Sequence, residues 1–265
     1  MSMNIRHFEV DAFTSRPFSG NPAGVCLLTT WLPDELLQRI AAENNLSETA
    51  FCKPSGDDFE LRWFTPAIEV DLCGHATLAT AFVLFTEAGF PQQQVRFHTR
   101  SGWLAATRRG ELVELDFPAR PPGPCAAPDE LLRGLGRTPR EVLKSRDFVA
   151  IYDSPDDVAA LEPDQTLLAR VDALGVIATA PGGGADFVSR FFAPRAGIAE
   201  DPVTGSAHCS LIPLWAGRLG KRELFARQIS QRGGELFCRD LGERVGIGGH
   251  AVVYCRGELE VPDAG

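Results

Sequence analysis

Two long segments of the chain are apolar around almost the whole circumference of a helix. The first covers residues 75–87, and the second covers residues 206–218, where Pro213 lies inside the run. A helix that is apolar nearly all round is buried, so each segment predicts a central helix covered by other elements. Proline cannot donate the backbone hydrogen bond that an interior helical position requires, so we expect either a kink at Pro213 or the loss of one helical hydrogen bond there.

The rest of the chain mostly shows the short alternating pattern of half-buried strands. Residues 8–13 alternate in this way, and the turn at Gly20-Asn21-Pro22 follows them. An amphipathic helix is predicted from Pro33 to Asn45, because its apolar residues recur at helical spacing. Two shorter helices are expected at residues 129–135 and 165–171. Further strands are expected at 24–28, 48–53, 58–64, 95–99, 102–108, 112–117, 147–152, 175–180, 186–192 and 251–255.

The two central-helix segments belong to an internal duplication. Each follows an aromatic stretch that ends in proline, and each begins with glycine, a polar residue and alanine. The separation of matching residues grows from 128 to 131 and then to 132, which small insertions explain. The matching pairs are Arg62–Pro66 with Arg190–Pro194, Gly74–Ala76 with Gly205–Ala207, Thr99–Gly102 with Ser230–Gly233, and Gly110–Val113 with Gly242–Val245. A repeat of about half the chain predicts two similar lobes.

The boundary between the lobes is expected in the stretch 118–128, which holds five prolines in eleven residues. We therefore predict an N-terminal lobe of residues 1–118 and a C-terminal lobe of residues 119–265, with the last strand able to pack back on the first lobe. In each lobe a mostly antiparallel sheet would wrap around the central helix, which is an α+β fold with pseudo-twofold symmetry. Two helix N-termini would line the cleft between the lobes.

Composition narrows the class of protein. The 265 residues are 44% hydrophobic, enough for a core in each lobe, and a net charge of −9 without a long basic run argues against a nucleic-acid partner. The seven cysteines are odd in number and show no C-x-x-C spacing, which favours a reduced, cytoplasmic protein. No signal-peptide pattern and no long uncharged apolar window occur, so we expect no membrane association.

Two carboxylates are candidates for acid/base chemistry. Glu48 lies where a predicted helix leads into an apolar strand, and partial burial there would suit a general acid or base. The alternative is a solvated or helix-capping glutamate. Asp201 precedes the second central helix. It is either a second acid/base and hydrogen-bond acceptor for the substrate, or a carboxylate placed there because the helix dipole favours it.

The start of each central helix is a candidate binding site. Gly74 and Gly205 allow close approach to the backbone, and the N–H groups of a helix N-terminus bind carboxylates and developing oxyanions. His75 and Ser206 follow these glycines, so we expect both side chains to face the cleft. The alternative is helix capping, which serine does well and histidine poorly.

Cys73 and Thr204 also correspond across the repeat. Two cysteines here would suggest a two-base racemase, but a single thiol cannot supply both faces of a substrate. A metal site formed by Cys73, His75, His208 and Cys209 does not match the ligand spacing of closed zinc sites. We therefore expect no metal at these four residues.

These residues lie within a series of short motifs that runs from residue 8 to residue 215. The motifs are Asp11-Ala12-Phe13, Gly20-Asn21-Pro22, Asn45-Leu46-Ser47-Glu48-Thr49, Phe64-Thr65-Pro66, Gly74-His75-Ala76-Thr77-Leu78 and Glu200-Asp201-Pro202-Val203-Thr204-Gly205-Ser206-Ala207, and the chain ends with a further motif, Gly249-His250-Ala251-Val252. As a set they resemble the PhzF-like isomerase family of phenazine biosynthesis, which shares its fold with diaminopimelate epimerase.

The resemblance implies a homodimer of two-lobed chains that isomerise a small molecule by proton transfer without cofactor or metal. It implies that Glu48 is the acid/base and that His75, Asp201 and Ser206 bind substrate and assist proton movement. Backbone at Gly74 and Gly205 would line the same site, beside Cys73 and Thr204. The chain departs from the phenazine enzyme itself at Cys73 and Pro202-Val203, which puts the phenazine substrate in doubt.

Three functions follow as hypotheses. The first is a cofactor-independent isomerase acting on a small carboxylate-bearing metabolite, with Glu48 moving the proton. The second is a one-thiol racemase or epimerase that uses Cys73 with Glu48, and the third is a non-catalytic binding protein on the same scaffold. Inactivation by Cys73→Ala would favour the second hypothesis, and the intact set of polar residues weighs against the third.

Overall fold

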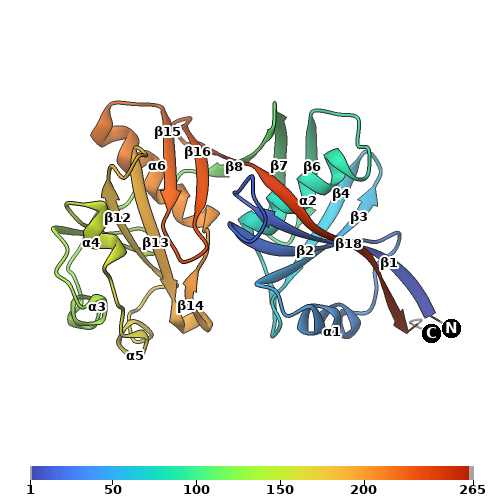
Figure 1. The fold of residues 1–265 in the computed structure, drawn as a ribbon, viewed down its shortest axis with the longest axis horizontal. Helices are drawn as coiled ribbons and strands as arrows, with labels where there is room; N and C mark the ends of the chain where they lie inside the picture. The colour runs from blue at the N-terminus through green and yellow to red at the C-terminus, as the bar shows by residue number, and fades with distance from the viewer. Residues whose placement is uncertain (1, 263–265) are drawn as a thin grey trace. The chain divides into compact units, whose positions relative to one another are not determined.

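The computed structural model describes residues 2–262, which form two compact units (Figure 1). The first unit comprises residues 2–116 together with 248–262, and the second comprises residues 117–247. Each unit is a mostly antiparallel sheet with a buried helix, so the α+β class predicted from the sequence is confirmed. No helix within residues 2–262 is long and apolar enough to cross a membrane.

The sheet of the first unit follows one order of pairing, β18–β1–β2–β3–β4–β6–β7–β8. The pairs β2–β3 and β4–β6 are parallel and the others are antiparallel, while the short β5 pairs with β4. Helix α1 (Asp34–Asn44) connects β2 to β3. The strands are β1 (Ser2–Ala12), β2 (Asn21–Leu27), β3 (Glu48–Ser55), β4 (Asp58–Phe64), β5 (Glu69–Val70), β6 (Gln94–Thr99), β7 (Gly102–Arg109), β8 (Leu112–Pro118) and β18 (Ala251–Pro262).

Helix α2 (Gly74–Thr86) is the central helix of this unit, as the apolar pattern predicts. All its residues except Phe82 and Thr86 are buried, and it contacts β1, β2, β3, β7 and β18. Two of its buried polar residues, Thr77 and Thr80, donate their hydroxyl groups to backbone carbonyls one turn earlier. The helix therefore buries no unsatisfied threonine hydroxyl, which would otherwise cost stability.

The second unit repeats this plan. Its strands pair in the order β9–β10–β11–β12–β13–β15–β16, and the parallel pairs β11–β12 and β13–β15 correspond to β2–β3 and β4–β6. Its central helix is α6 (Gly205–Leu219), which continues through Pro213. The other elements are β9 (Gly123–Pro124), α3 (Asp129–Leu135), β10 (Glu141–Lys144), β11 (Phe148–Ile151), α4 (Pro155–Ala159), α5 (Gln165–Leu168), β12 (Val176–Pro181), β13 (Phe187–Ala193), η1 (Pro194–Ala196), β14 (Ile198–Asp201), β15 (Glu223–Gln228), β16 (Gly234–Asp240) and β17 (Arg244–Gly249).

The duplication extends to individual contacts. Ser101 donates its hydroxyl to the carbonyl oxygen of Asp71 at 2.7 Å, and Ser230 makes the equivalent bond to Pro202 at 2.7 Å. The structure therefore matches Ser230 with Ser101, and not with Thr99 as the sequence comparison predicted, because the two hairpin loops differ in length. Both bonds fasten the hairpin loop that follows a central helix to the segment that precedes it. A shared strand order and shared side-chain bonds indicate that the two units descend from one repeated sequence.

Aromatic packing fills the second unit around α6. Phe187 of β13 stacks on Trp215 of α6 with ring centroids 5.8 Å apart, and both side chains are buried. The indole N–H of Trp215 donates to the buried hydroxyl of Thr179 at 3.0 Å. This bond satisfies the one polar atom of an otherwise apolar side chain, which is the usual condition for burying tryptophan.

Candidate functional site

The first group of candidate residues lies at the N-terminus of α2. Glu48 is the first residue of β3, and His75 is the second residue of α2. The Nε2 atom of His75 lies 3.1 Å from Oε2 of Glu48, and their side chains are only 6% and 12% exposed. The structure thus brings two residues together that are far apart in the sequence, in a contact close enough for a hydrogen-bonded ion pair.

Asn21 and Cys73 complete this group. The amide nitrogen of Asn21, the first residue of β2, lies 3.1 Å from Nδ1 of His75, and Asn21 is fully buried. The sulfur of Cys73 lies 3.6 Å from the same Nδ1 and 3.9 Å from Nε2. The imidazole of His75 is therefore held between a carboxylate, an amide and a thiol. Sequence reasoning quoted Asn21 only as part of a turn motif and gave it no role.

Electrostatics favours a charged His75. Burial alone lowers the pKa of His75, but the neighbouring Cys73 and Glu48 raise it, and the result lies well above the usual value of 6.5. Burial and the charge of Glu48 raise the pKa of Cys73, so the thiol stays protonated at neutral pH. The Glu48 carboxylate is then the anion that stabilises the imidazolium.

A charged His75 also decides how the amide of Asn21 is oriented. Both ring nitrogens of an imidazolium are donors, so Nδ1 requires an acceptor. The oxygen and nitrogen of an amide occupy nearly the same outline, and their assignment follows the hydrogen-bond network. The imidazolium selects the orientation in which Asn21 presents Oδ1 to Nδ1, whereas a neutral ring accepts from Nδ2.

The backbone at the start of α2 is fixed by local bonds. Cys73 precedes the helix in extended conformation, and its side chain does not cap the helix. The hydroxyl of Thr77 donates to the Cys73 carbonyl at 2.5 Å. The first turn is thus held in place without a side-chain cap over its N–H groups, which leaves it suited to an anionic group.

The second group of candidate residues lies in the other unit, at the N-terminus of α6. Ser206 is the second residue of α6, and its Oγ accepts a hydrogen bond of 3.0 Å from Nη2 of Arg146. Arg146 also pairs with the buried carboxylate of Asp147 at 3.2 Å. Asp147 accepts in addition from the backbone N–H of Gly175 at 3.1 Å. Sequence reasoning missed Arg146, because a lone arginine in a loop belongs to no motif.

Asp201 belongs to a network centred on Thr204 and Gln228. Asp201 is the last residue of β14, and the hydroxyl of Thr204 donates to its Oδ2 at 2.5 Å. The buried amide of Gln228 accepts from the Thr204 backbone N–H at 2.9 Å and donates to the Thr204 hydroxyl at 3.2 Å and to the Asp201 carbonyl at 2.7 Å. Because Gln228 donates to the Thr204 oxygen, the hydroxyl proton is directed at the Asp201 carboxylate. Gln228 was not among the expected site residues either.

His208 and Cys209, the other two residues of the four-residue metal set considered from the sequence, have different surroundings from Cys73 and His75. His208 is fully buried on α6, and its Nδ1 lies 2.8 Å from the carbonyl oxygen of Thr204. Burial lowers the pKa of His208 to about 4, although the bond to Thr204 raises it slightly. Burial raises the pKa of Cys209 to about 11. In the first unit, by contrast, Glu48, Cys73 and His75 offer ligand atoms that all lie within 4.8 Å of one another.

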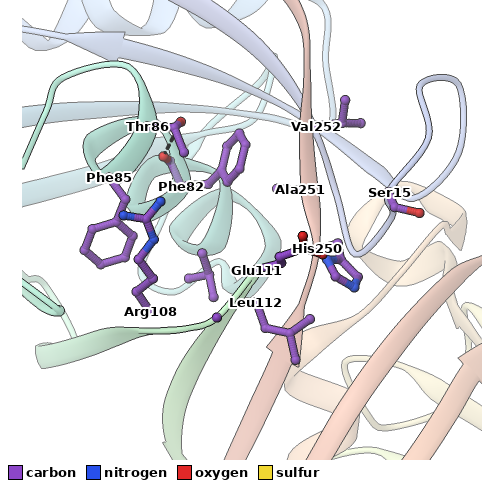
Figure 2. A pocket seen from close by; sticks show the side chains of 12 residues that line it. Ser15, Phe82, Phe85, Thr86, Arg108, Glu111, Leu112, His250, Ala251 and Val252 are labelled. Carbon is purple, nitrogen blue, oxygen red and sulfur yellow. Dashed lines mark hydrogen bonds between the residues drawn. The ribbon is translucent and has the colours of Figure 1, made fainter.

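A pocket of about 350 Å³ lies toward the other end of α2 (Figure 2). Because a helix rises about 1.5 Å per residue, Phe82 is about 10 Å along the axis from His75. Figure 2 shows Arg108 on the side of Phe85, with its guanidinium 5.9 Å from the ring centroid, and Glu111 on the side of His250. The lining residues include none of the candidate site residues; they are Ser15, Phe82, Phe85, Thr86, Arg108, Gly110, Glu111, Leu112, Val113, His250, Ala251 and Val252. The pocket is therefore separate from the Glu48–His75 group.

Comparison with known proteins assigns the chain to a family. The model of the phenazine biosynthesis-like protein family matches residues 10–257. An uncharacterized isomerase of Pseudomonas aeruginosa is 52% identical over 259 residues, which cover 98% of this chain and 100% of that protein. A human phenazine biosynthesis-like domain-containing protein is 42% identical, with coverage of 97% and 99%.

A solved structure of a family member also matches nearly the whole chain. The crystal structure of a phenazine biosynthesis protein of the PhzF family from Enterococcus faecalis matches with a TM-score of 0.95 and 46% identity, covering 97% of this chain and 99% of that one. Family model, relatives and structure all span nearly the whole chain. The chain therefore belongs to the phenazine biosynthesis-like protein family and is an isomerase.

Proposed function

We propose that the protein moves a proton between two positions of a small carboxylate-bearing metabolite, with Glu48 as the acid/base and without a cofactor. The observation that carries this proposal is the nearly buried contact of 3.1 Å between Glu48 and His75 at the N-terminus of α2. A carboxylate, an imidazolium and a helix N-terminus together provide a base and two sources of positive charge. This combination suits proton abstraction next to a carboxylate, which requires a base and stabilisation of the negative charge that develops.

The proposed reaction has two steps. Glu48 removes a proton from a carbon activated by a neighbouring carboxylate or double bond, and the electron pair of the C–H bond moves into an enolate-like system. Glu48 then returns the proton to another carbon of that system, so no atoms or electrons are gained or lost. His75 engages one oxygen of Glu48 and keeps the carboxylate in one orientation. Positive charge from His75 and the α2 N-terminus stabilises the intermediate.

The second unit would contribute to substrate binding. The hydroxyl of Ser206 beside the Arg146 guanidinium, at the start of α6, is a donor set that suits a carboxylate. Asp201, oriented by Thr204, would accept a hydrogen bond from a hydroxyl or amino group of the substrate. Gly74 and Gly205 would let the substrate approach the two helix starts. The combined action of residues from both units, and a homodimeric state, remain predictions from the family resemblance.

A one-thiol racemase is the second candidate, and the contact of 3.6 Å between Cys73 and His75 is what favours it. The thiolate is the reactive form of cysteine. Burial and the Glu48 charge raise the pKa of Cys73, so little thiolate forms at neutral pH. Glu48 is therefore the better base, and replacement of Cys73 by alanine decides between the two candidates.

The test is solvent deuterium exchange followed by NMR. The protein is incubated in D₂O with a panel of amino, hydroxy and unsaturated cyclic acids, and entry of deuterium at carbon is measured. We expect exchange by the wild type and by Glu43→Gln, an exposed control on α1, and at least about a hundredfold loss in Glu48→Gln, as for removal of a general base. Exchange that persists in Glu48→Gln would refute the role of Glu48. Loss of exchange in Cys73→Ala alone would favour the racemase, and specific binding without exchange would favour a binding protein.

A further inference from the structure

We infer that Glu48, Cys73 and His75 form a site for a divalent metal ion of the zinc type, and that the ion inhibits the enzyme. Each residue offers one ligand atom, and these atoms all lie within 4.8 Å of one another. The inhibitory consequence rests on the proposed function, whereas the binding of the ion does not. In this site Cys73 acts as a metal ligand, a role that it does not have in the proton transfer by Glu48.

The ligand atoms are spaced for a tetrahedral ion. Zinc binds imidazole nitrogen and carboxylate oxygen at about 2.1 Å and thiolate sulfur at about 2.3 Å. Tetrahedral angles then separate nitrogen from oxygen by about 3.4 Å and nitrogen from sulfur by about 3.6 Å. The observed separations are 3.1 Å between His75 Nε2 and Glu48 Oε2, and 3.9 Å between His75 Nε2 and Cys73 Sγ. Each of these two separations differs from the ideal by about 0.3 Å. The Glu48 oxygen and the Cys73 sulfur lie within 4.8 Å of each other, against an ideal of about 3.6 Å, so side-chain adjustment has to bring these two ligands closer together.

Neighbouring groups support the same ligands. A metal-binding histidine usually bonds through its other ring nitrogen to an oxygen acceptor, and the amide of Asn21 lies 3.1 Å from Nδ1 of His75. The sulfur of Cys73 lies at the N-terminus of α2, and a helix N-terminus stabilises a thiolate. Asn21 thus orients the ring so that Nε2 faces the Glu48 carboxylate, while the Cys73 sulfur lies 3.6 Å from Nδ1 and 3.9 Å from Nε2.

The donor set selects the type of ion. One sulfur, one nitrogen and one carboxylate oxygen suit zinc or cobalt(II), whereas magnesium and calcium prefer oxygen ligands. Three protein ligands leave a fourth position for water, as in open zinc sites. The dication replaces one proton on the imidazolium and one on the thiol, so the net charge of the group stays at zero.

An ion in this position would block the proposed reaction. Glu48 would donate its electron pair to the metal and could not accept a proton from carbon. His75 would lose the proton that gives the site its positive charge. The ion is therefore an inhibitor of the proposed proton transfer and not its cofactor.

Cobalt(II) provides a test that needs no substrate. Chelator-treated protein is titrated with cobalt(II), and the visible d–d bands and the thiolate-to-cobalt charge-transfer band are recorded. We expect one equivalent to bind to the wild type with a thiolate band. The band should be lost in Cys73→Ala, the affinity should fall at least about tenfold in Glu48→Gln, and Cys209→Ala, a buried cysteine on α6, should match the wild type. No band in the wild type, or an unchanged band in Cys73→Ala, would overturn the site. Circular dichroism verifies that each variant is folded.

Zinc in the deuterium-exchange assay tests inhibition separately. Exchange by the wild type should fall with zinc and return with a chelator, while exchange by Cys73→Ala, relative to its own rate without metal, should resist the same zinc concentration by at least about tenfold. Equal inhibition of both proteins would overturn the proposal. Cobalt binding without exchange on any substrate would retain the metal site and count against the proposed function. Exchange without cobalt binding would count against the metal site and retain the proposed function.

Discussion

Acid is expected to destabilise the protein through one buried imidazole, that of His208. Its Nδ1 lies 2.8 Å from the carbonyl oxygen of Thr204, and its ring centroid lies 5.8 Å from that of Phe187. Because a carbonyl only accepts, Nδ1 carries the proton. The other nitrogen, Nε2, is buried and has no hydrogen-bond partner among residues 2–262. A second proton would have to enter at Nε2, where these residues provide no acceptor.

The magnitude follows from the pKa of His208, which burial lowers from 6.5 to about 4. Between these values the unfolded chain binds the proton and the folded chain does not. Stability is therefore lost as the pH falls through this window, and no further loss from His208 occurs below about pH 4. At about 1.4 kcal/mol per pH unit, the loss amounts to about 3 kcal/mol.

The assay is urea unfolding between pH 7 and pH 4, compared for the wild type and His208→Asn. The asparagine amide can donate to Thr204 as Nδ1 does, but it does not titrate, so other groups cancel in the difference between the two proteins. We expect the wild type to lose about 3 kcal/mol more than the variant across this range. Parallel pH curves would refute the reasoning. An imidazole ¹⁵N spectrum in which His208 takes up a second proton near pH 6.5 would also refute it.

Three further predictions concern other buried groups. Replacement of Gln228 by methionine should lower the free energy of unfolding by about 2–4 kcal/mol in urea, because it removes three buried hydrogen bonds. In NMR titrations His75 should take up its proton well above pH 6.5, since Cys73 and Glu48 raise its pKa, and this pKa should fall in Glu48→Gln. Gly249→Ala should lower the melting temperature, with a cost of about 1–3 kcal/mol, because the new Cβ would lie 2.4 Å from the ring of Phe13.

Control variants show whether each predicted effect comes from the contact to which it is attributed. The control Gln94→Met alters an exposed glutamine with one surface hydrogen bond and should change the free energy of unfolding by less than about 0.5 kcal/mol. If Gln228→Met caused an equally small loss, the three hydrogen bonds of Gln228 would add no stability. Gly257→Ala places a Cβ with nothing within 4 Å and should leave the melting temperature nearly unchanged. Equal effects of the two glycine variants would contradict the packing argument. A His75 pKa that is the same with and without the Glu48 carboxylate would show that the ion pair does not form.

The helices could be predicted from the sequence because their signals are local. The apolar runs placed α2 and α6 within about one residue, and the amphipathic pattern placed α1, which ends at Asn45 in the left-handed conformation with φ 48°. The ends of a strand depend instead on the partner strands with which it pairs, and these are distant in the sequence. β18 extends to Pro262 rather than ending at residue 255, because it pairs with β1 along its length. Residues 256–260, three of which are charged, show no buried alternation that would have indicated a strand.

The candidate site was predictable only where a motif contained it. Glu48 and His75 stand in motifs, so both were named, but their contact depends on how β3 and α2 pack. Arg146 and Gln228 interact through the ends of long side chains that come from a loop and a strand end, and no local pattern marks such residues. Helix α4 was also missed, since five residues are too few to show a helical period.

Comparison of the two repeats explains how one scaffold acquired two kinds of site. Thr99 ends β6 and Gln228 ends β15, and both are buried. The Thr99 hydroxyl bonds within its own hairpin, to the carbonyl of Gly102, whereas the longer Gln228 side chain reaches the residue that precedes α6. The longer Gln228 side chain therefore fixes Thr204 and directs its hydroxyl at a carboxylate. The shorter Thr99 side chain of the first repeat does not make a corresponding bond to the residue that precedes α2.

The helix starts have diverged in the same way. The first repeat places a histidine against a glutamate and a cysteine, which yields a group that can gain and lose protons. The second places Ser206 against Arg146, which yields a hydroxyl beside a permanent positive charge. A guanidinium does not titrate in the physiological range, so the second repeat is suited to holding an anion and the first to moving a proton. If this division is correct, Arg146→Gln should weaken substrate binding in the exchange assay, with a larger effect on KM than on kcat. Glu48→Gln should lower kcat with little change in KM, and the opposite pattern in either variant would refute the division.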